Sequence, residues 1–178
     1  MPVSVAVIDI GSNSVLLLIG ERASSGWRIL LDTARITRLG EDFSQSQTLQ
    51  SQAIERTLNA LTEYFAMCRA HRVERVIAVA TAVVRQARNR EVFMEKVLQV
   101  VSSVTEFTVL SESEEARYSF LSVVRDPDLF VGRDADATVG GFVASASSPT
   151  NNTPLLAVLD IGGGSVEVAL GREEVQHW

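Results

Sequence analysis

A strand–turn–strand segment occurs twice in this chain, and the two copies lie 151 positions apart. Residues Ala6–Gly20 align without gaps on Ala157–Gly171, and eight of the fifteen aligned positions are identical. In each copy an apolar run ends at Asp-Ile-Gly, a polar turn follows, and a second apolar run begins. Two apolar runs joined by a short polar turn are typical of a β-hairpin. The repeat therefore predicts two structurally related lobes, each built on the same hairpin.

The residues between the two hairpins predict a mixed sheet flanked by helices. A third strand pattern covers Trp27–Leu39, so the first three strands are expected to form an antiparallel meander. Apolar residues then recur at three- and four-residue steps, which indicates an amphipathic helix over Ser51–Ala70. Strand and helix patterns alternate after it, with strands expected at 73–80 and 106–110 and helices at 89–101 and 111–124. This order is typical of an α/β domain.

The expected domain organisation is a first lobe over residues 1–124, a flexible connection over 125–154, and the beginning of a second lobe over 155–178. Ser, Pro, Thr and Asn dominate the later part of the connection, a composition typical of long loops. The second lobe is expected to be truncated after its first hairpin. The apolar hairpin Leu155–Leu170 would then lack sheet partners, so we expect either that its edge pairs with a second copy, as in a homodimer, or that the hairpin is disordered.

The composition limits the chemistry that this chain can carry. One cysteine, Cys68, excludes an internal disulfide and a cysteine-rich zinc site, and two histidines provide little for histidine catalysis. Acid–base chemistry is therefore expected from carboxylates. The net charge of −6 provides no basic surface for nucleic acid. The apolar runs are well below the ~20 residues that span a bilayer, so we expect no membrane partner and a cytoplasmic protein.

Both hairpin turns carry groups that bind phosphate. Glycines let backbone N–H groups approach an anion closely, and hydroxyl and amide side chains add donors. Asp9 and Asp160 precede the turns and would repel phosphate unless a cation lay between, an arrangement that suits Mg²⁺. The alternative is that each Asp-Ile-Gly forms an ordinary turn. The expected phosphate-binding residues are Ser12, Asn13 and Ser14 in the first turn and Gly162, Gly163, Gly164 and Ser165 in the second.

Two groups of acidic residues have both a functional and a structural interpretation. Glu167 is a single acidic residue in an apolar strand and shares a face with Ser165, so it either has a functional role beside that turn or faces solvent. Ser111 and Glu114 have the spacing of a capping box at the start of the third helix. Glu115, which is not needed for that cap, is either a general base in the cleft between the lobes or one more favourable charge in a first helical turn.

Arg85 follows the strand expected at 73–80 by a few residues. Because open α/β sheets bind ligands at the carboxyl ends of their strands, Arg85 is a candidate for a bidentate phosphate contact. The alternative is that Arg85, Arg88 and Arg90 form a solvated approach to the second helix, and spacing alone does not choose between the two.

Taken in this order, the motifs resemble those of the exopolyphosphatase / guanosine pentaphosphate phosphohydrolase family. The Glu-Glu-Ala-Arg helix start separates this family from the kinases and chaperones that share its aspartate hairpins. The resemblance implies a ribonuclease H-like fold of the actin-like ATPase superfamily. The matching segments are VIDIGSNS at 7–14, RLGE at 38–41, AT at 80–81 with Arg85, EEAR at 114–117 and LDIGGGSVE at 159–167.

The resemblance also implies a role for each matching residue. Glu115 is expected to be the catalytic base, and Arg85 is expected to contact substrate phosphate. Asp160 and Glu167 are expected to surround Mg²⁺, with Asp9 nearby. The implied reaction is in-line attack of water on the terminal phosphoryl group of inorganic polyphosphate or of guanosine penta- or tetraphosphate.

Two other functions remain open on the sequence alone. A non-catalytic module would bind polyphosphate or a guanosine alarmone through the same turns without turnover. An actin-like ATPase or sugar kinase would need adenosine-binding motifs in its second lobe. The chain also departs from the family pattern at Ala82 and Val83 and in the length of the connection after residue 124. Family members continue beyond residue 178 to complete the second lobe, so whether these residues suffice for activity stays open.

Overall fold

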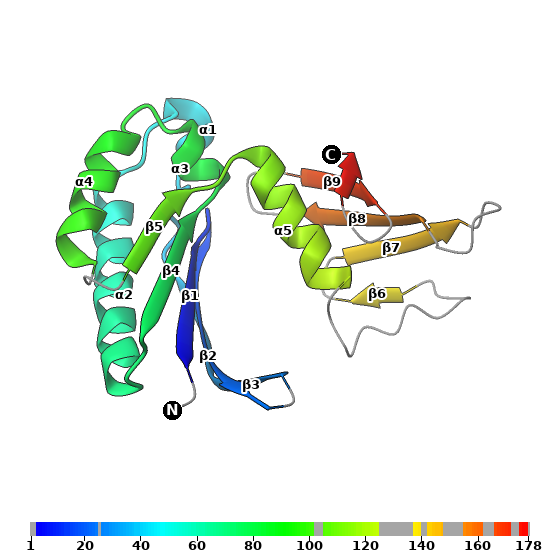
Figure 1. The fold of residues 1–178 in the computed structure, drawn as a ribbon. Coiled ribbons are helices and arrows are strands. Elements are labelled where there is room, and N and C mark those ends of the chain that lie inside the picture. Colours follow the sequence, from blue (N-terminus) through cyan, green and yellow to red (C-terminus); the bar gives the residue numbers. More distant parts are fainter. Residues whose placement is uncertain are drawn as a thin grey trace. The chain divides into compact units, whose positions relative to one another are not determined.

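A computed structural model describes residues 3–24, 26–101 and 105–124, and beyond them the backbone of five short strands; side chains are described as far as residue 122. The chain divides into two compact units, Met1–Leu110 and Ser111–Trp178, which are treated separately below (Figure 1). Among the described residues, no helix is both long and apolar enough to cross a membrane.

The first unit contains a five-stranded mixed sheet with the strand order β3-β2-β1-β4-β5. The first three strands pair antiparallel as a meander, whereas β4 is parallel to β1 and β5 is parallel to β4. The mixed α/β sheet expected from the sequence is thus confirmed. The strands are β1 Ser4–Ile10, β2 Ser14–Ala23, β3 Gly26–Ile36, β4 Arg75–Ala80 and β5 Thr105–Val109.

Two long helices cover one face of this sheet (Figure 1). Helix α2, Ser51–Ala70, has both ends where the apolar periodicity predicts them, and it buries Ile54, Leu61 and Phe65. Helix α4, Arg90–Val100, buries Phe93 and Val97 against the same core. Two short helices, α1 Phe43–Ser46 and α3 Ala82–Gln86, were not expected, because four or five residues are too few to show a helical period.

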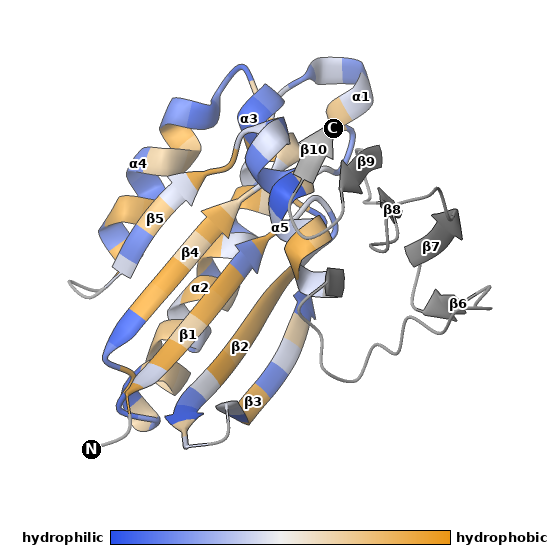
Figure 2. Ribbon diagram, turned by 45° about the vertical axis from the view of Figure 1, so that its right-hand side comes forward, coloured by the Kyte–Doolittle hydropathy of each residue, from blue (hydrophilic) through white to orange (hydrophobic). Residues whose placement is uncertain are grey.

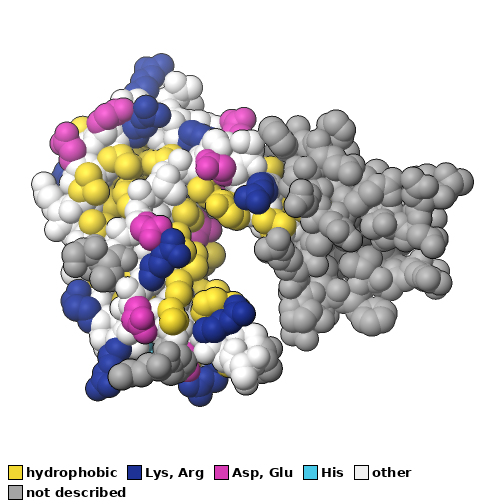
Figure 3. Space-filling view, viewed as in Figure 1, with side chains coloured by type: hydrophobic (Ala, Val, Ile, Leu, Met, Phe, Trp, Pro, Cys, Tyr) yellow, Lys and Arg dark blue, Asp and Glu magenta, His cyan; other side chains and the backbone are white. Residues whose placement is uncertain are grey.

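Alternation along β1 and β2 separates a buried face of the sheet from an open one. Ala6, Ile8 and Ile10 are fully buried beneath the helices, and Figure 2 shows β1, β2 and β4 as hydrophobic along most of their length. The intervening positions point to the other face, where Val7 is 39% exposed and Asp9 is half-buried. Figure 3 shows hydrophobic side chains reaching the surface of this unit among charges of both signs.

The second unit repeats the first hairpin in the same register. Strands β8, Leu155–Ile161, and β9, Val166–Gly171, pair antiparallel. Moving each β1–β2 pair along the chain by 151 positions, from Val5↔Gly20 to Ile10↔Val15, gives the corresponding β8–β9 pair. The internal repeat read from the sequence is therefore also a repeat of backbone pairing.

The second hairpin has sheet partners on both sides, so the expectation of an unpartnered edge was wrong. The five antiparallel strands have the order β10-β9-β8-β7-β6. Strands β6, Ala137–Val139, and β7, Phe142–Ser147, lie within the segment expected to be a flexible connection, and β10 is Val175–His177. Pairing with β7 satisfies the backbone groups that β8 would otherwise expose.

Helix α5, Glu112–Val124, is part of the second unit, although the sequence places it with the first lobe. It packs against β8 and β9. Ala116 and Phe120, four residues apart on one face of the helix, are both buried. The sequence pattern predicted the helix, but it could not identify the sheet that covers its apolar face.

Tyr64 provides a test of how α2 is fastened to the sheet. Its side chain is fully buried, and its hydroxyl donates to the carbonyl of Val15 at 3.0 Å. We expect Tyr64→Phe to lower the free energy of unfolding by about 1 kcal/mol, because a buried hydrogen bond is lost. Urea denaturation measures this change. Tyr118→Phe is the control, since Tyr118 is 51% exposed, and equal effects of the two substitutions would contradict the assignment.

Candidate functional site

Parallel pairing brings the candidate residues of the first unit to one edge of the sheet. Ile10 pairs with Ala80, and Ala80 pairs with Val109, so β1, β4 and β5 end side by side. The N–H of Thr81 donates to the carbonyl of Ile10, and that of Leu110 donates to Ala80. Loops at the carboxyl ends of parallel strands are the usual ligand sites of open α/β sheets.

The first hairpin turn is hydrogen-bonded to a neighbouring loop of the same unit. Ser12 and Asn13 link β1 to β2, but neither has the positive φ that the favoured two-residue hairpin turns require. The N–H groups of Thr37 and Arg38 donate to the Asn13 carbonyl at 3.0 and 2.9 Å, and the N–H of Gly40 donates to the Ser12 carbonyl at 2.8 Å. The turn is therefore anchored through its carbonyl groups.

This anchoring leaves the donors of the turn available. Within the described part of the chain, the backbone N–H groups of Ser12 and Asn13 donate to no acceptor, and the side chains of Ser12, Asn13 and Ser14 form no hydrogen bond. Asn13 is exposed, and the two serines are half-buried. Adjacent N–H groups with hydroxyl and amide donors beside them form a cluster of donors suited to binding an anion.

Arg85 lies at the same edge and is fixed in place. It is in α3, directly after β4, and its Nη1 donates to the carbonyl of Leu110 at 2.7 Å. Arg88 and Arg90 are exposed, whereas Arg85 is half-buried. The structure thus distinguishes Arg85 from the two arginines that follow it, a distinction that spacing alone could not make.

The hydrogen bonds at the start of α5 show which of its glutamates makes the cap. The backbone N–H and the hydroxyl of Ser111 donate to Oε2 of Glu114 at 2.8 and 2.7 Å, and the N–H of Glu114 approaches the Ser111 hydroxyl at 3.2 Å. This is the reciprocal pattern of a capping box. The hydrogen bonds from Ser111 hold the pKa of Glu114 below its usual value. Glu115 is half-buried, and its role as the base stays a prediction.

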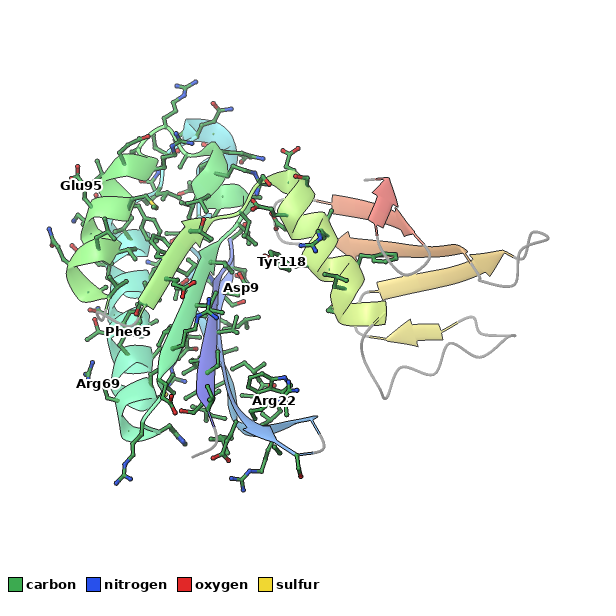
Figure 4. All side chains as sticks on the ribbon, in the orientation of Figure 1. Asp9, Arg22, Phe65, Arg69, Glu95 and Tyr118 are labelled. Carbon is green, nitrogen blue, oxygen red and sulfur yellow. The ribbon has the colours of Figure 1, made fainter. Side chains whose placement is uncertain are left out.

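The proposed metal ligands are only partly described. Asp9 lies on β1, on the side of the sheet away from α2 (Figure 4). Asp160 on β8 pairs directly with Glu167 on β9, at the rung where Asp9 pairs with Leu16 in the first hairpin. Their side chains, and the turn residues Gly162, Gly163, Gly164 and Ser165, lie outside the described residues. The residues that are described contain no group of three potential metal ligands.

The sequence motifs include the segment RLGE at 38–41, but they did not reveal that its residues support the turn. Gly40 lies so close to it that an added Cβ would be 3.3 Å from Cβ of Ser12. Arg38 has a φ of 50°, a left-handed conformation that is rare for a non-glycine residue and often marks a functional site. Both belong to the segment RLGE at 38–41, whose conformation no periodic pattern could have revealed.

The sheet order, the helices on one face and the repeated hairpin define a ribonuclease H-like α/β domain of the actin-like type. The chain belongs to the Ppx/GppA phosphatase family, whose sequence pattern matches residues 18–129. The family proposed from the sequence motifs is thus confirmed.

Named relatives are similar in sequence to this chain over nearly its whole length. Exopolyphosphatase 2 of Mycobacterium tuberculosis is 34% identical over 96% of this chain and 49% of its own length. A guanosine-5'-triphosphate,3'-diphosphate pyrophosphatase of Aliivibrio fischeri is 28% identical over 97% of this chain and 30% of its own. The crystal structure of the Aquifex aeolicus family member superposes with a TM-score of 0.66 at 31% identity, over 98% of this chain and 52% of that one. The chain thus spans about half the length of such relatives or less.

The cap at Glu114 predicts a pH dependence. Because the pKa of Glu114 is lowered in the folded state, the stabilisation is fully present above the unfolded pKa of about 4.3 and is lost as the pH falls through the folded value. We expect the amide proton shift of Ser111, followed by NMR, to titrate with a midpoint below 4.3.

Two variants control this titration. Glu114→Gln keeps an acceptor oxygen and should abolish the titration of Ser111, whereas Glu112→Gln should leave it unchanged, since Glu112 is exposed and bonds to no described residue. A titration that survives in Glu114→Gln would refute the cap.

Proposed function

We propose that the protein hydrolyses the terminal phosphoanhydride bond of inorganic polyphosphate or of a guanosine penta- or tetraphosphate. The observation that carries this proposal is the Ser12–Ser14 turn, whose carbonyls are occupied while its N–H and hydroxyl donors are available. Membership of a phosphatase family and relatives named for these two substrate classes support it. Phosphate oxygens are the ligands that such a group of donors fits best.

The proposed division of roles uses both units. The first turn and Arg85 bind and orient the phosphate chain from the sheet edge of the first unit, where Arg85 is already fixed by Leu110. The second turn, Gly162–Ser165, is proposed to bind phosphate in the same way as its repeat. Donors positioned in advance stabilise the charge that develops during phosphoryl transfer, and this is the main catalytic contribution available without a covalent intermediate.

Three carboxylates, Asp9, Asp160 and Glu167, are proposed to hold Mg²⁺. The fit rests on donor chemistry and register, because Mg²⁺ prefers carboxylate and phosphate oxygens and Asp160 pairs directly with Glu167 across the hairpin. When bound, the ion would neutralise phosphate charge.

Glu115 is proposed as the general base that accepts a proton from the attacking water. The cap at Ser111 is made by Glu114, so Glu115 is not required to satisfy the helix end. Its half-buried position restricts the side chain more than the exposed positions of Glu112 and Glu114 do. The proton would pass from water to a Glu115 carboxylate oxygen as the new phosphorus–oxygen bond forms.

Glu115→Ala tests the base. In the protein expressed from its complete gene, we expect phosphate release from tripolyphosphate to slow by about 10²–10⁴-fold in kcat, the range that a general base contributes. Glu112→Ala in the same helical turn is the control and should retain activity. Unchanged turnover in Glu115→Ala would eliminate the assigned base, and tight binding without turnover by the unmodified protein would favour the non-catalytic module.

Arg85→Lys tests the phosphate contact. Lysine retains the charge but lacks the planar fork, so we expect tripolyphosphate to bind roughly tenfold more weakly in calorimetry. Arg88→Lys, three residues away and exposed, should bind as the unmodified protein does. Equal affinities of the two variants would contradict the role of Arg85.

A further inference from the structure

We propose that Arg56 is a positioning residue for the phosphate-binding turn, acting through the loop Thr37–Glu41. The inference rests on the proposed function and names the residue that orients its first turn. Arg56 lies on α2, outside the carboxyl edge of the sheet and outside every motif found in the sequence.

Arg56 is bonded to both ends of this loop. Its Nε donates to the carbonyl of Thr37 at 2.9 Å, and its Nη2 donates to Oε2 of Glu41 at 2.6 Å. The backbone that carries Arg56 is itself firmly placed, because the next residue, Thr57, is fully buried and its hydroxyl donates to the Ala53 carbonyl. The loop is therefore fastened to the central helix of the unit through one planar guanidinium.

The loop in turn sets the direction of the turn's peptide groups. The Ser12 carbonyl accepts from Gly40, so it points towards the loop. In a planar trans peptide the C=O and the following N–H point in opposite directions, and the Asn13 N–H therefore points away from the loop. Thr37 and Arg38 donate to the Asn13 carbonyl, so this carbonyl also points towards the loop. The N–H of the same peptide, which belongs to Ser14, therefore points away from the loop.

Arg56 also bonds to the carbonyl that lies opposite Asn13 in the β2–β3 register. Residues that face each other in a hydrogen-bonded antiparallel pair normally exchange two bonds. Asn13 and Thr37 continue the β2–β3 register by one rung, and the N–H of Thr37 donates to Asn13. The return bond is absent between these two described residues, and the Thr37 carbonyl accepts from Arg56. This bond fixes the direction of the Thr37 carbonyl, while the Asn13 N–H donates to no described acceptor.

The exposure of the ion pair indicates that its main role is orientation rather than stability. The side chains of Arg56 and Glu41 are 41% and 44% exposed. Exposed ion pairs contribute little to the free energy of unfolding. Removing Arg56 should therefore change the conformation of the loop and the turn much more than it changes the melting temperature.

The test compares Arg56→Ala, Arg56→Lys and Arg35→Ala. Arg35→Ala is the matched control, because Arg35 on β3 forms an exposed ion pair at 3.6 Å with Glu63, which lies on the same helix as Arg56, and its side chain forms no hydrogen bond to the described loop residues. In the 178-residue chain we expect Arg56→Ala to increase amide exchange at Thr37, Arg38 and Gly40 about tenfold or more, with a Tm shift of a few degrees at most. In Arg56→Lys the amide exchange rates should lie between those of the unmodified chain and of Arg56→Ala, since lysine lacks the planar fork that joins two acceptors. Arg35→Ala should show no change in exchange.

Kinetics of the complete protein separate positioning from a merely structural role. Arg56→Ala should raise KM for tripolyphosphate about tenfold and change kcat less than about threefold, the pattern of lost substrate binding. A loss of Tm and kcat with KM unchanged would assign Arg56 a structural role and overturn the proposal, as would exchange equal to that of Arg35→Ala. If the unmodified protein neither binds nor hydrolyses tripolyphosphate, the proposed function fails and this inference fails with it. If the unmodified protein is active and Arg56→Ala has the same KM and the same amide exchange, only the inference fails.

Discussion

The parallel pairing of β1 with β4 is the constraint on which the candidate site of the first unit depends. It makes two strands that are 64 residues or more apart in the chain end at the same sheet edge. Asp9 lies near the end of β1, the Ser12–Asn13 turn follows that strand, and Arg85 follows β4. One register of hydrogen bonds thus assembles an acidic group, a donor-rich turn and a cation. The buried residues of β1, packed beneath α2 and α4, maintain this register, because a slip of one residue would turn the apolar side chains out of the core.

The carbonyls of the Ser12–Asn13 turn accept hydrogen bonds from the neighbouring loop, and its N–H donors point away from that loop. This arrangement explains why a polar turn with no positive φ is kept in an otherwise regular hairpin. The loop that holds it, including Gly40, is close-packed against Ser12 and is fastened to α2 by Arg56. Support therefore comes from the helical layer, on the protein side of the turn, while the opposite side remains available for an anion.

The two hairpins share backbone pairing but differ in their acidic groups. At the equivalent rung Asp9 faces Leu16 in the first hairpin, whereas Asp160 faces Glu167 in the second. One copy thus has a single carboxylate beside an apolar residue, and the other has two carboxylates on neighbouring strands. A common framework with unequal side chains is consistent with phosphate binding by both turns and with a larger share of the metal binding by the second.

The sequence alone determined the order of the five strands and the two long helices of the first unit, the α2 boundaries and the repeat, because apolar periodicity and identity at a fixed spacing can be read directly from the chain. It also identified the capping box at Ser111, whose partners lie three residues apart. Only the tertiary structure showed that Arg85 is fixed at the sheet edge, that β7 pairs with β8, and that Arg56 bonds to the loop beside the turn. The contacts of Arg85 and Arg56 join residues well separated in the chain, and β7 lies in a segment whose composition is typical of a loop. Such contacts leave no periodic trace in the sequence.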